Sequence, residues 1–493
     1  MNNILGFSAG FHDAAASVIS SNGDILFAGH SERYSKKKHD ANICQGLIDE
    51  VLTYAPDTVA YYERPWAKQI RHLHAGQHID WHNSTLNQVI KNQLGGWFRG
   101  CKTHSFNHHL SHAAAGFQTS PYSRATVVVI DAIGESDTIS IWAAEYDKTG
   151  KAQYKKLWGQ RYPHSIGLFY SAMTKRVGLR PLDEEYILMG MAAYGRPAWE
   201  DHIKHSLIHN EWDMTFKTNL HTGVGDNFLT GADDYDIAAS AQAVVENLIY
   251  NIMLRAKKFN WSNNLVYMGG VALNCSANRN LGDYFDNIWI MPNPGDAGSS
   301  LGAAALAYGK QLNWQNAYLG TDIPGEYPVN NILDHLLSDK IVGVASGRAE
   351  FGPRALGNRS LLADPRGIEI KDKVNAIKRR QKFRPFAPVV LEEMAAEYFD
   401  MPSGFSNSRY MQSVAGCRYP DLFPAIVHGD GTSRVQTVPK DGSGIRELLE
   451  RWFVLTGCPM LLNTSLNIRG EPVVNDRADA DRFEKMYDVK VCS

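Results

Sequence analysis

The chain lacks the cysteine spacing of a disulfide scaffold or a zinc ribbon. Its 493 residues hold 6 cysteines, which are scattered, and no two of them form a Cys-x-x-Cys pair. Disulfide frameworks and zinc ribbons need paired, closely spaced cysteines, so both classes are excluded. Scattered thiols suit a reducing compartment, and we therefore expect a cytoplasmic protein.

An excess of one charge and long apolar runs are also missing. The 50 Lys and Arg residues nearly balance the 52 Asp and Glu residues, and the net charge of −2 attracts neither nucleic acid nor acidic membranes. No apolar run approaches the roughly 20 residues that span a bilayer, so we expect no membrane segment. A strand predicted at the N-terminus argues against a signal peptide.

The hydrophobic pattern predicts an α/β protein with two domains and no internal repeat. Strands are expected at residues 4–8, 14–19, 25–29, 125–130, 265–268 and 341–345. Helices are expected at residues 105–117 and 237–259. Glycine and proline crowd into residues 316–330 and mark a domain boundary. We therefore place the first domain at residues 1–320, a linker at 321–330 and the second domain at 331–493.

His108 and His112 are the most informative pair in the first domain. They stand four residues apart in a predicted helix, so both imidazoles project from one face and suit a metal ion. A helix that happens to carry histidines is the alternative interpretation. Asp131 ends a predicted buried strand, where open α/β sheets place ligand-binding groups. Two imidazoles with one or two carboxylates suit a borderline divalent ion such as iron(II) or zinc.

Glycines at predicted strand ends and helix starts indicate a phosphate site in the same domain. Their backbone N–H groups can approach a phosphate closely, although glycine pairs also form plain turns. The predicted nucleotide-binding residues are Gly134, Gly269, Gly270, Asn274 and Gly298.

The second domain is basic where turn-forming glycines and arginines alternate, between Gly347 and Arg366. Residues 371–384 add seven further cations: Lys371, Lys373, Lys378, Arg379, Arg380, Lys382 and Arg384. Arginine binds phosphate through two parallel hydrogen bonds, but a solvated helix face or a nucleic-acid patch would also explain a basic run. Polar residues also follow the predicted strand at 460–462. The predicted phosphate ligands are Arg348, Arg354, Arg359, Lys382, Arg384, Asn463, Ser465 and Asn467.

Together these motifs resemble the O-carbamoyltransferases of the nodulation-factor, cephamycin and tobramycin type. They include Phe-His-Asp-Ala-Ala from residue 11 and His-His-Leu-Ser-His-Ala-Ala from residue 108. The matching segments lie in order at residues 11–15, 31–33, 38–40, 108–114, 189–195, 269–274, 295–298, 348–366, 428–432 and 462–472. The resemblance covers nearly the whole chain. The chain departs from the family pattern at Ile187, where a lysine is frequent; this bears on the acceptor rather than the chemistry.

The resemblance implies an actin-like (ASKHA) first domain, similar to the threonylcarbamoyl-transfer protein of tRNA modification, with iron at its centre. His108, His112, Asp131 and Asp296 match its metal ligands. It implies a second α/β domain like threonylcarbamoyl-AMP synthases, where carbamoyl phosphate and ATP, with Mg²⁺, give carbamoyl-adenylate and pyrophosphate.

The resemblance further implies that the carbamoyl group then passes to a hydroxyl of a small molecule or a nucleotide in the first domain. His12 is the candidate general base, because imidazole titrates near neutrality, and Lys38 is a second candidate catalytic residue. The main alternative function is a sugar kinase of the actin-like class, which would leave the arginine-rich second domain without a role. An RNA-modifying enzyme, a hydrogenase-maturation carbamoyl carrier and a non-catalytic binding module are further alternatives. The hydrogenase-maturation carrier would need cysteine-rich zinc motifs, which are absent from the sequence.

Overall fold

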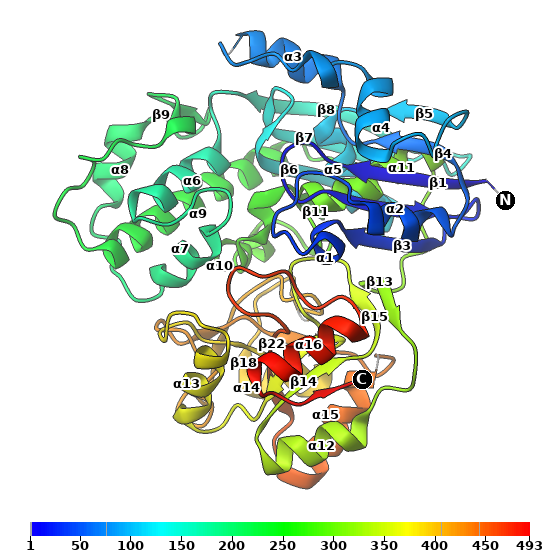
Figure 1. Cartoon of the computed structure of the whole chain (residues 1–493). Coiled ribbons are helices and arrows are strands. Elements are labelled where there is room, and N and C mark those ends of the chain that lie inside the picture. Colours follow the sequence, from blue (N-terminus) through cyan, green and yellow to red (C-terminus); the bar gives the residue numbers. More distant parts are fainter. Residues whose placement is uncertain (1, 75, 406, 443) are drawn as a thin grey trace.

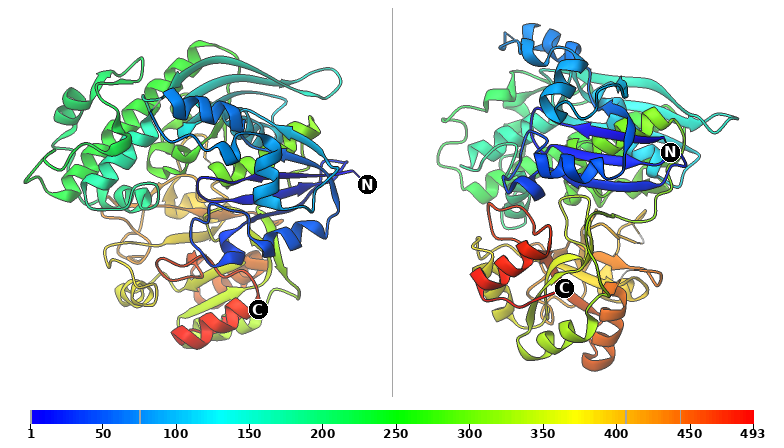
Figure 2. Two further views of the ribbon diagram at one scale, coloured as in Figure 1. Left: turned by 45° about the horizontal axis from the view of Figure 1, so that its top comes forward. Right: turned by 45° about the vertical axis from the view of Figure 1, so that its right-hand side comes forward.

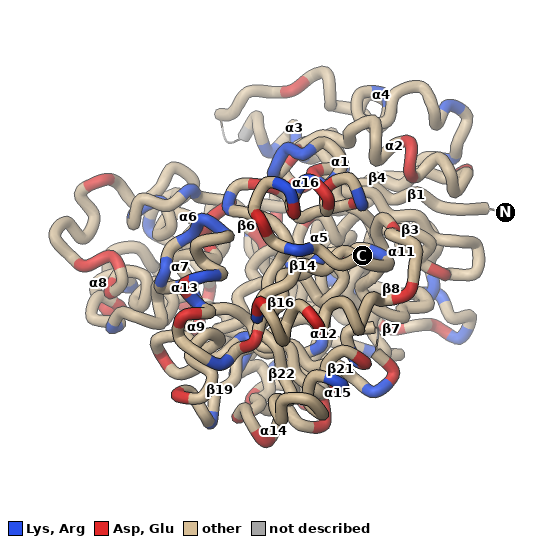
Figure 3. Tube along the Cα trace, turned by 60° about the horizontal axis from the view of Figure 1, so that its bottom comes forward, with Lys and Arg blue, Asp and Glu red and all other residues tan. Residues whose placement is uncertain are grey.

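The computed structural model describes residues 2–74, 76–405, 407–442 and 444–493. Figure 1 shows a larger N-terminal part above a smaller C-terminal part, joined near strand β13 (Tyr318–Ile323). The two further views in Figure 2 show the same division. Figure 3 shows Lys and Arg segments interspersed with Asp and Glu segments, in keeping with the balanced charge.

The first domain contains two five-stranded sheets with the same strand order. The first sheet runs β3-β2-β1-β4-β5 and consists of β1 (Asn3–Ser8), β2 (Ala15–Ile19), β3 (Ile25–His30), β4 (Pro56–Tyr61) and β5 (Lys102–Ser105). The second runs β8-β7-β6-β11-β12 and consists of β6 (Arg124–Gly134), β7 (Asp137–Tyr146), β8 (Ala152–Arg161), β11 (Asn264–Met268) and β12 (Asn287–Trp289).

Counted along the chain, the first strand of each sheet pairs antiparallel with the second, and the second pairs antiparallel with the third. The fourth strand pairs parallel with the first, and the fifth pairs parallel with the fourth. The absence of an internal repeat among the residues therefore does not extend to the fold. The pattern of strand pairing repeats while the residues do not, so residue self-similarity could not reveal it.

Helices α5 (His108–Thr119) and α11 (Ser299–Tyr308) contact each other and fill the space between the two sheets. Helix α11 packs on β1 and β2, and α5 packs on β6 and β11. The helices approach closely because Gly302 faces the carbonyl of Ser111, where an added Cβ would lie only 1.9 Å from that oxygen. This close packing places the start of α5 beside the start of α11.

Four helices form a lobe beside the second sheet: α6 (Ile166–Arg176), α7 (Glu185–Ala192), α8 (Glu200–Leu207) and α9 (Asp234–Lys258) (Figure 1). Among the described residues, α9 is the one helix long and apolar enough to cross a membrane, with 67% of its most apolar window buried inside the protein. It contacts α6, α7 and α8, and this packing accounts for its apolar character. Shorter first-domain helices are α1 (Glu32–Ser35), α2 (Gln45–Leu52), α3 (Pro65–His74), α4 (Leu86–Leu94) and α10 (Cys275–Asn278).

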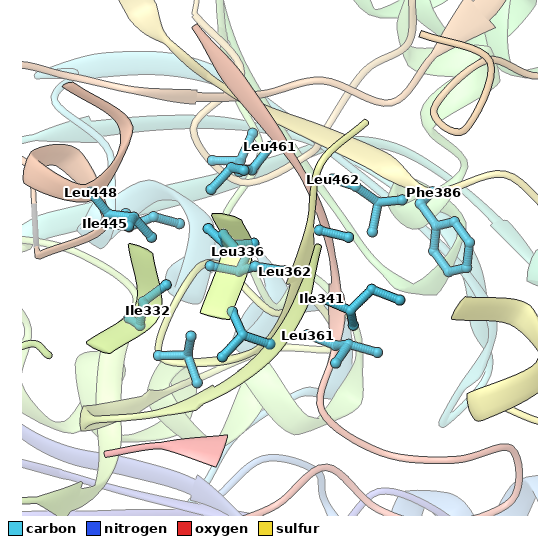
Figure 4. Close-up of a cluster of buried hydrophobic side chains, with 14 of the residues drawn as sticks. Ile332, Leu336, Ile341, Leu361, Leu362, Phe386, Ile445, Leu448, Leu461 and Leu462 are labelled. Atoms are coloured by element: carbon cyan, nitrogen blue, oxygen red, sulfur yellow. The ribbon is translucent and has the colours of Figure 1, made fainter. Parts of the chain in front are cut away.

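The second domain is built on a six-stranded mixed sheet of order β21-β17-β22-β16-β14-β23. Its strands are β14 (Ile341–Ala345), β16 (Arg359–Ala363), β17 (Ala387–Leu391), β21 (Gln436–Val438), β22 (Met460–Ser465) and β23 (Val491–Cys492). Its helices include α12 (Val329–Ser338), α13 (Ile368–Ile377), α14 (Ala395–Tyr398), α15 (Gly444–Thr456) and α16 (Arg477–Tyr487). Figure 4 shows its core, in which Ile332 and Leu336 of α12 and Ile445 and Leu448 of α15 meet the leucines of the sheet.

The predicted linker is partly regular structure. Strand β13 ends at Ile323 and pairs antiparallel with β15 (Gly347–Glu350), while α12 begins at Val329. Strand β13 also contacts β3 of the first domain. The boundary is therefore bridged by backbone hydrogen bonds. Gly320 lies within β13, and Pro324, Gly325 and Pro328 lie in the short segment between β13 and α12.

Candidate functional site

Four buried side chains meet at the centre of the first domain. His108 and His112 come from the first turns of α5, Asp131 lies on β6, and Asp296 precedes α11. The Nε2 atom of His108 lies 3.3 Å from a carboxylate oxygen of each aspartate and 3.1 Å from Nε2 of His112. One ligand atom from each residue lies within 4.8 Å of all the others. The structure thus brings together the four residues predicted as metal ligands.

Neighbouring groups orient these side chains. Asn107 caps α5 by accepting from the backbone N–H of Leu110, so the helix begins at His108. The Nδ1 of His112 donates to the carbonyl of Pro294 at 3.1 Å, which turns Nε2 toward the aspartates. The Nδ1 of His108 lies 3.6 Å from the carboxylate of Glu63, and such a carboxylate behind an imidazole orients metal-bound histidines.

The donor set fits a divalent cation. Two imidazole nitrogens and two carboxylates suit iron(II) or zinc, and all four side chains are buried. Burial lowers the pKa of His108, but the nearby carboxylates, led by Asp296, outweigh it and raise that pKa well above 6.5. Burial raises the pKa of Asp131, but hydrogen bonds from His108 and His112 outweigh burial and lower that pKa well below its usual value. Buried charges of this kind need a partner, and a cation held between the carboxylates would supply one.

A second polar group lies on the wall of the neighbouring cavity. His12 donates from Nδ1 to Asp13 at 2.9 Å, and the other oxygen of Asp13 accepts from His39 at 2.7 Å. His39 also donates to Asp183 at 2.7 Å, and Lys38 donates to the same oxygen at 3.2 Å. The two predicted catalytic residues, His12 and Lys38, therefore belong to one hydrogen-bonded group, and both line the cavity.

The carboxylates of this group keep its histidines protonated. Burial lowers the pKa of His12, but the hydrogen bond to Asp13 and the charges of Asp296 and Asp131 outweigh burial and raise that pKa to about 9. Burial likewise lowers the pKa of His39, but Asp13 and Asp183 raise it to about 10. A bound dication would offset the charges of Asp296 and Asp131, and the pKa of His12 would then fall toward neutrality.

One cavity of about 460 Å³ lies between the two domains. From the first domain it is lined by His12, Lys38, His39, Asp131, Gly270 and Asp296. From the second domain it is lined by Arg469, which forms an ion pair with Glu184, and by five further cations, Arg354, Lys378, Arg380, Arg384 and Arg434. Asn463, Ser465 and Asn467, all predicted as ligands, also line it. Two residues of the four-residue cluster, Asp131 and Asp296, therefore line the same cavity as the basic group.

The five cations form no ion pair with a carboxylate within the described residues. Lys378 donates to the carbonyl and side-chain oxygens of Asn467 at 2.9 and 3.0 Å, and Arg380 donates to Asn375 at 2.7 Å. Burial and the charge of Arg434 lower the pKa of Arg354 to about 9. Burial and the charges of Arg380 and Arg384 lower that of Lys378. Mutual repulsion in a shared cavity makes this group a site for polyanions.

The structure places three of the predicted phosphate ligands elsewhere. Arg359 is fully buried and donates to the backbone carbonyls of Asn475, Ser346, Gly347, Asn358 and Thr321. Arg348 donates to the carbonyls of Leu26, Leu319 and Gly320, and it joins the two domains. Lys382 is exposed and does not line the cavity. Arg348 and Arg359 are therefore structural, because their donors are already used.

Sequence reasoning missed Lys378, Arg380 and Arg434 as cavity residues, and it also missed Glu63, His39 and Asp183. Lys378 and Arg380 lay within the basic run that was noted, but the run alone could not show which side chains face inward. Nothing near Asp183 in the sequence signalled a site, because its partners come from distant segments. Arg434 follows the matching segment 428–432 closely, but that resemblance did not show which nearby side chain faces the cavity.

The predicted nucleotide-binding glycines have different roles. Gly270 lines the cavity and donates from its N–H to Asp131 at 3.2 Å, and Asn274 also lines it. Gly134 lies under the imidazoles, where an added Cβ would be 2.4 Å from Cδ2 of His108. Gly269 and Gly298 face the carbonyls of Ile130 and Asn293 in close backbone contacts. Three of the five residues therefore make room for packing and do not line the cavity.

Ile187, the departure from the family pattern, is buried in α7 with 1% of its surface exposed. Its neighbour Tyr186 lines the cavity instead, and the guanidinium of Arg384 lies 4.9 Å from the Tyr186 ring centroid. Position 187 is therefore a core position in this chain.

The duplicated sheets with two helices between them define an actin-like α/β first domain, as predicted. Component A of the (R)-2-hydroxyglutaryl-CoA dehydratase of Acidaminococcus fermentans covers 62% of this chain and 98% of its own, with a TM-score of 0.36 and 16% identity. Residues 86–305 match the family model of the carbamoyltransferase N-terminus, and residues 333–492 match that of the carbamoyltransferase C-terminus.

Relatives also match along most of the chain. The nodulation protein NolNO of Sinorhizobium fredii is 30% identical over 95% of this chain and 76% of its own length. An uncharacterized protein of Synechocystis, sll1178, is 34% identical over 98% of this chain and 94% of its own. The chain therefore belongs to the carbamoyltransferase family, and it is an enzyme that transfers carbamoyl groups. The predicted family and the predicted enzyme class are confirmed.

Proposed function

We propose that the protein is an ATP-dependent O-carbamoyltransferase for a small-molecule acceptor that carries a hydroxyl group. One observation carries the proposal: a single cavity is lined by five unpaired cations on one side and by Asp131 and Asp296 of the buried four-residue cluster on the other. The cations would bind the phosphate groups of two substrates, and the four-residue cluster would hold a divalent cation for the transfer step.

In the first half-reaction, the second domain would bind ATP and carbamoyl phosphate side by side. The adenylate keeps one phosphate of ATP, so water must release the phosphate of carbamoyl phosphate before carbamate attacks ATP. The products are carbamoyl-adenylate, phosphate and pyrophosphate. Arg354, Arg384 and Arg434 would offset the repulsion between the two polyanions, and Lys378 is held in place by Ser465 and Asn467.

In the second half-reaction, the first domain would hold the adenylate against the acceptor. A divalent cation bound by His108, His112, Asp131 and Asp296 supplies Lewis-acid stabilisation of phosphate charge when present, and iron(II) is the predicted ion. His12 lines the same cavity with Nδ1 engaged by Asp13, which leaves Nε2 for the acceptor hydroxyl. The proposal assigns His12 the role of general base.

The half-reactions can be measured separately. Exchange of labelled pyrophosphate into ATP reports adenylate formation, and this exchange is expected to require carbamoyl phosphate. Transfer is measured as carbamate ester formation in a screen of hydroxyl acceptors. Arg354→Ala should reduce both measurements, because adenylate formation comes first. His12→Asn should abolish transfer and leave the exchange reaction intact.

A sugar kinase would give the opposite pattern, since it releases ADP and needs no carbamoyl phosphate. Formation of ADP on a sugar, with no exchange dependent on carbamoyl phosphate, would refute the proposal. Loss of both half-reactions in His12→Asn would refute only the role of His12 as general base.

The cytoplasmic location of the protein stays a prediction.

A further inference from the structure

A line of hydrogen bonds leads away from His12 along the cavity wall. His12 donates to one oxygen of Asp13 at 2.9 Å, and Nδ1 of His39 donates to the other at 2.7 Å. Nε2 of His39 then donates to Asp183 at 2.7 Å. All four side chains line the cavity, and they come from three separate segments of the chain.

His39 is the bridge of this line, and it uses both ring nitrogens. Both of its partners are carboxylates, which only accept, so both nitrogens carry a proton. An imidazolium thus ties the loop after β1 to the loop before α7. Without it, Asp13 and Asp183 would lose the group that links them, and Asp13 would keep only His12 as an ion-pair partner among the described residues.

The backbone around this bridge is strained, which indicates that the surrounding structure fixes the positions of Asp13 and His39. Asp13 and His39 adopt left-handed conformations with φ of 52° and 55°, which non-glycine residues seldom do. The N–H of His39 donates to Glu32 at 3.0 Å, and this bond holds the turn. Strain of this kind persists where the surrounding structure fixes a functional side chain.

The far end of the line is anchored by cations. One oxygen of Asp183 accepts from Lys38 at 3.2 Å as well as from His39, and the other lies 2.7 Å from the guanidinium of Arg180. Asp183 is therefore a fixed carboxylate, and its position sets that of His39.

We propose that His39 and Asp183 are positioning residues for carbamoyl transfer: they fix Asp13 and thereby hold the ring of His12 with Nε2 toward the acceptor. The inference rests on the proposed function, because it assigns these residues to its second half-reaction. In that step the acceptor oxygen bonds to the carbamoyl carbon, and the bond from that carbon to the adenylate oxygen breaks. AMP leaves with the electron pair, and the hydroxyl proton passes to Nε2 of His12.

Two variants test the inference. His39→Gly removes the bridge, leaves room for free imidazole and tolerates the left-handed backbone. Asp183→Asn keeps the shape of the anchor and removes its charge. His209→Ala, at an exposed histidine on the short strand β9 (Ile208–Asn210), is the matched control. Methanol serves as the alcohol probe and methyl carbamate is measured. AMP release to water is followed in parallel, so that the comparison does not depend on methanol entry.

We expect both variants to lower kcat for methyl carbamate and the AMP release rate at least about tenfold. KM for methanol and the pyrophosphate exchange rate should stay within about twofold. Imidazole should restore transfer in His39→Gly, and it should do nothing for Asp183→Asn or His209→Ala. Transfer at the wild-type rate, an equal loss of both half-reactions, or no response of His39→Gly to imidazole would overturn the inference. Absence of carbamoyl phosphate-dependent exchange in the wild type would instead refute the proposed function.

Discussion

Replacement of Gly302 by alanine tests whether the contact between α5 and α11 builds the four-residue cluster. The added Cβ would lie 1.9 Å from the carbonyl oxygen of Ser111 and 2.7 Å from its carbon. Ordinary contact begins near 3.4 Å, so the helices must separate by about 1.5 Å. Both neighbours are backbone atoms of a helix, which cannot move aside as a flexible side chain can.

Two terms of opposite sign decide the stability of this variant. Alanine gains about 1 kcal/mol of helix propensity over glycine. Overpacking at a rigid contact costs about 1–3 kcal/mol or more. We expect a net loss of stability, and a separation of about 1.5 Å also exceeds the roughly 0.2 Å tolerance of metal–ligand distances. His108 and His112 would then move away from Asp296, and the bound metal would fall to a small fraction of one equivalent.

Gly190 on α7 is the matched control, because an added Cβ there meets nothing within 4 Å. Gly190→Ala should therefore be as stable as the wild type or slightly more so. Urea unfolding of the three proteins gives the stability difference, and elemental analysis after incubation with iron(II) gives the metal content. Gly302→Ala with wild-type stability and a full equivalent of metal would refute this reasoning.

Three further predictions follow from individual side chains. Arg359→Met should lower the free energy of unfolding by several kcal/mol, because five backbone carbonyls lose their hydrogen-bond donor. If the variant were as stable as the wild type and lost only adenylate formation, Arg359 would instead be a substrate ligand. His39→Asn should lose the stability that the protonated ring supplies. Because the pKa of His39 rises from 6.5 to about 10 on folding, the difference in unfolding midpoint from wild type should be constant below pH 6.5 and shrink as the pH rises to 10. Arg434→Ala should raise KM for ATP and carbamoyl phosphate in the exchange assay and leave the thermal midpoint within about 2 °C, since Arg434 forms no ion pair with any residue that the structure describes. An unchanged KM would remove it from the substrate site.

Local chemistry made several elements predictable. Helix α5 begins at His108 because Asn107 caps it, and the spacing of His108 and His112 follows from the helical period. The buried strand predicted at 125–130 lies within β6, which runs on to Gly134 and places Asp131 inside the strand. Pairing with β7 extends the strand, and no pattern within one segment could show that partner.

The basic segments show where sequence reasoning stops. Arg348, Arg354 and Arg359 look alike in a glycine-rich stretch, yet only Arg354 of the three lines the cavity. Which arginine faces inward depends on strand pairing, since Arg348 lies on β15 and Arg359 starts β16. The carbonyls that bind Arg359 come from as far away as Thr321 and Asn475.

The sequence by itself determined the α/β class, the family and the residue types of the candidate metal cluster, because period, capping and motif are local properties. Only the tertiary structure decided which cations meet in the cavity, that the two sheets repeat one topology, and that His39 links Asp13 to Asp183. Each of these depends on contacts between residues far apart in the chain, and such contacts are set by packing and by the pairing of buried charges.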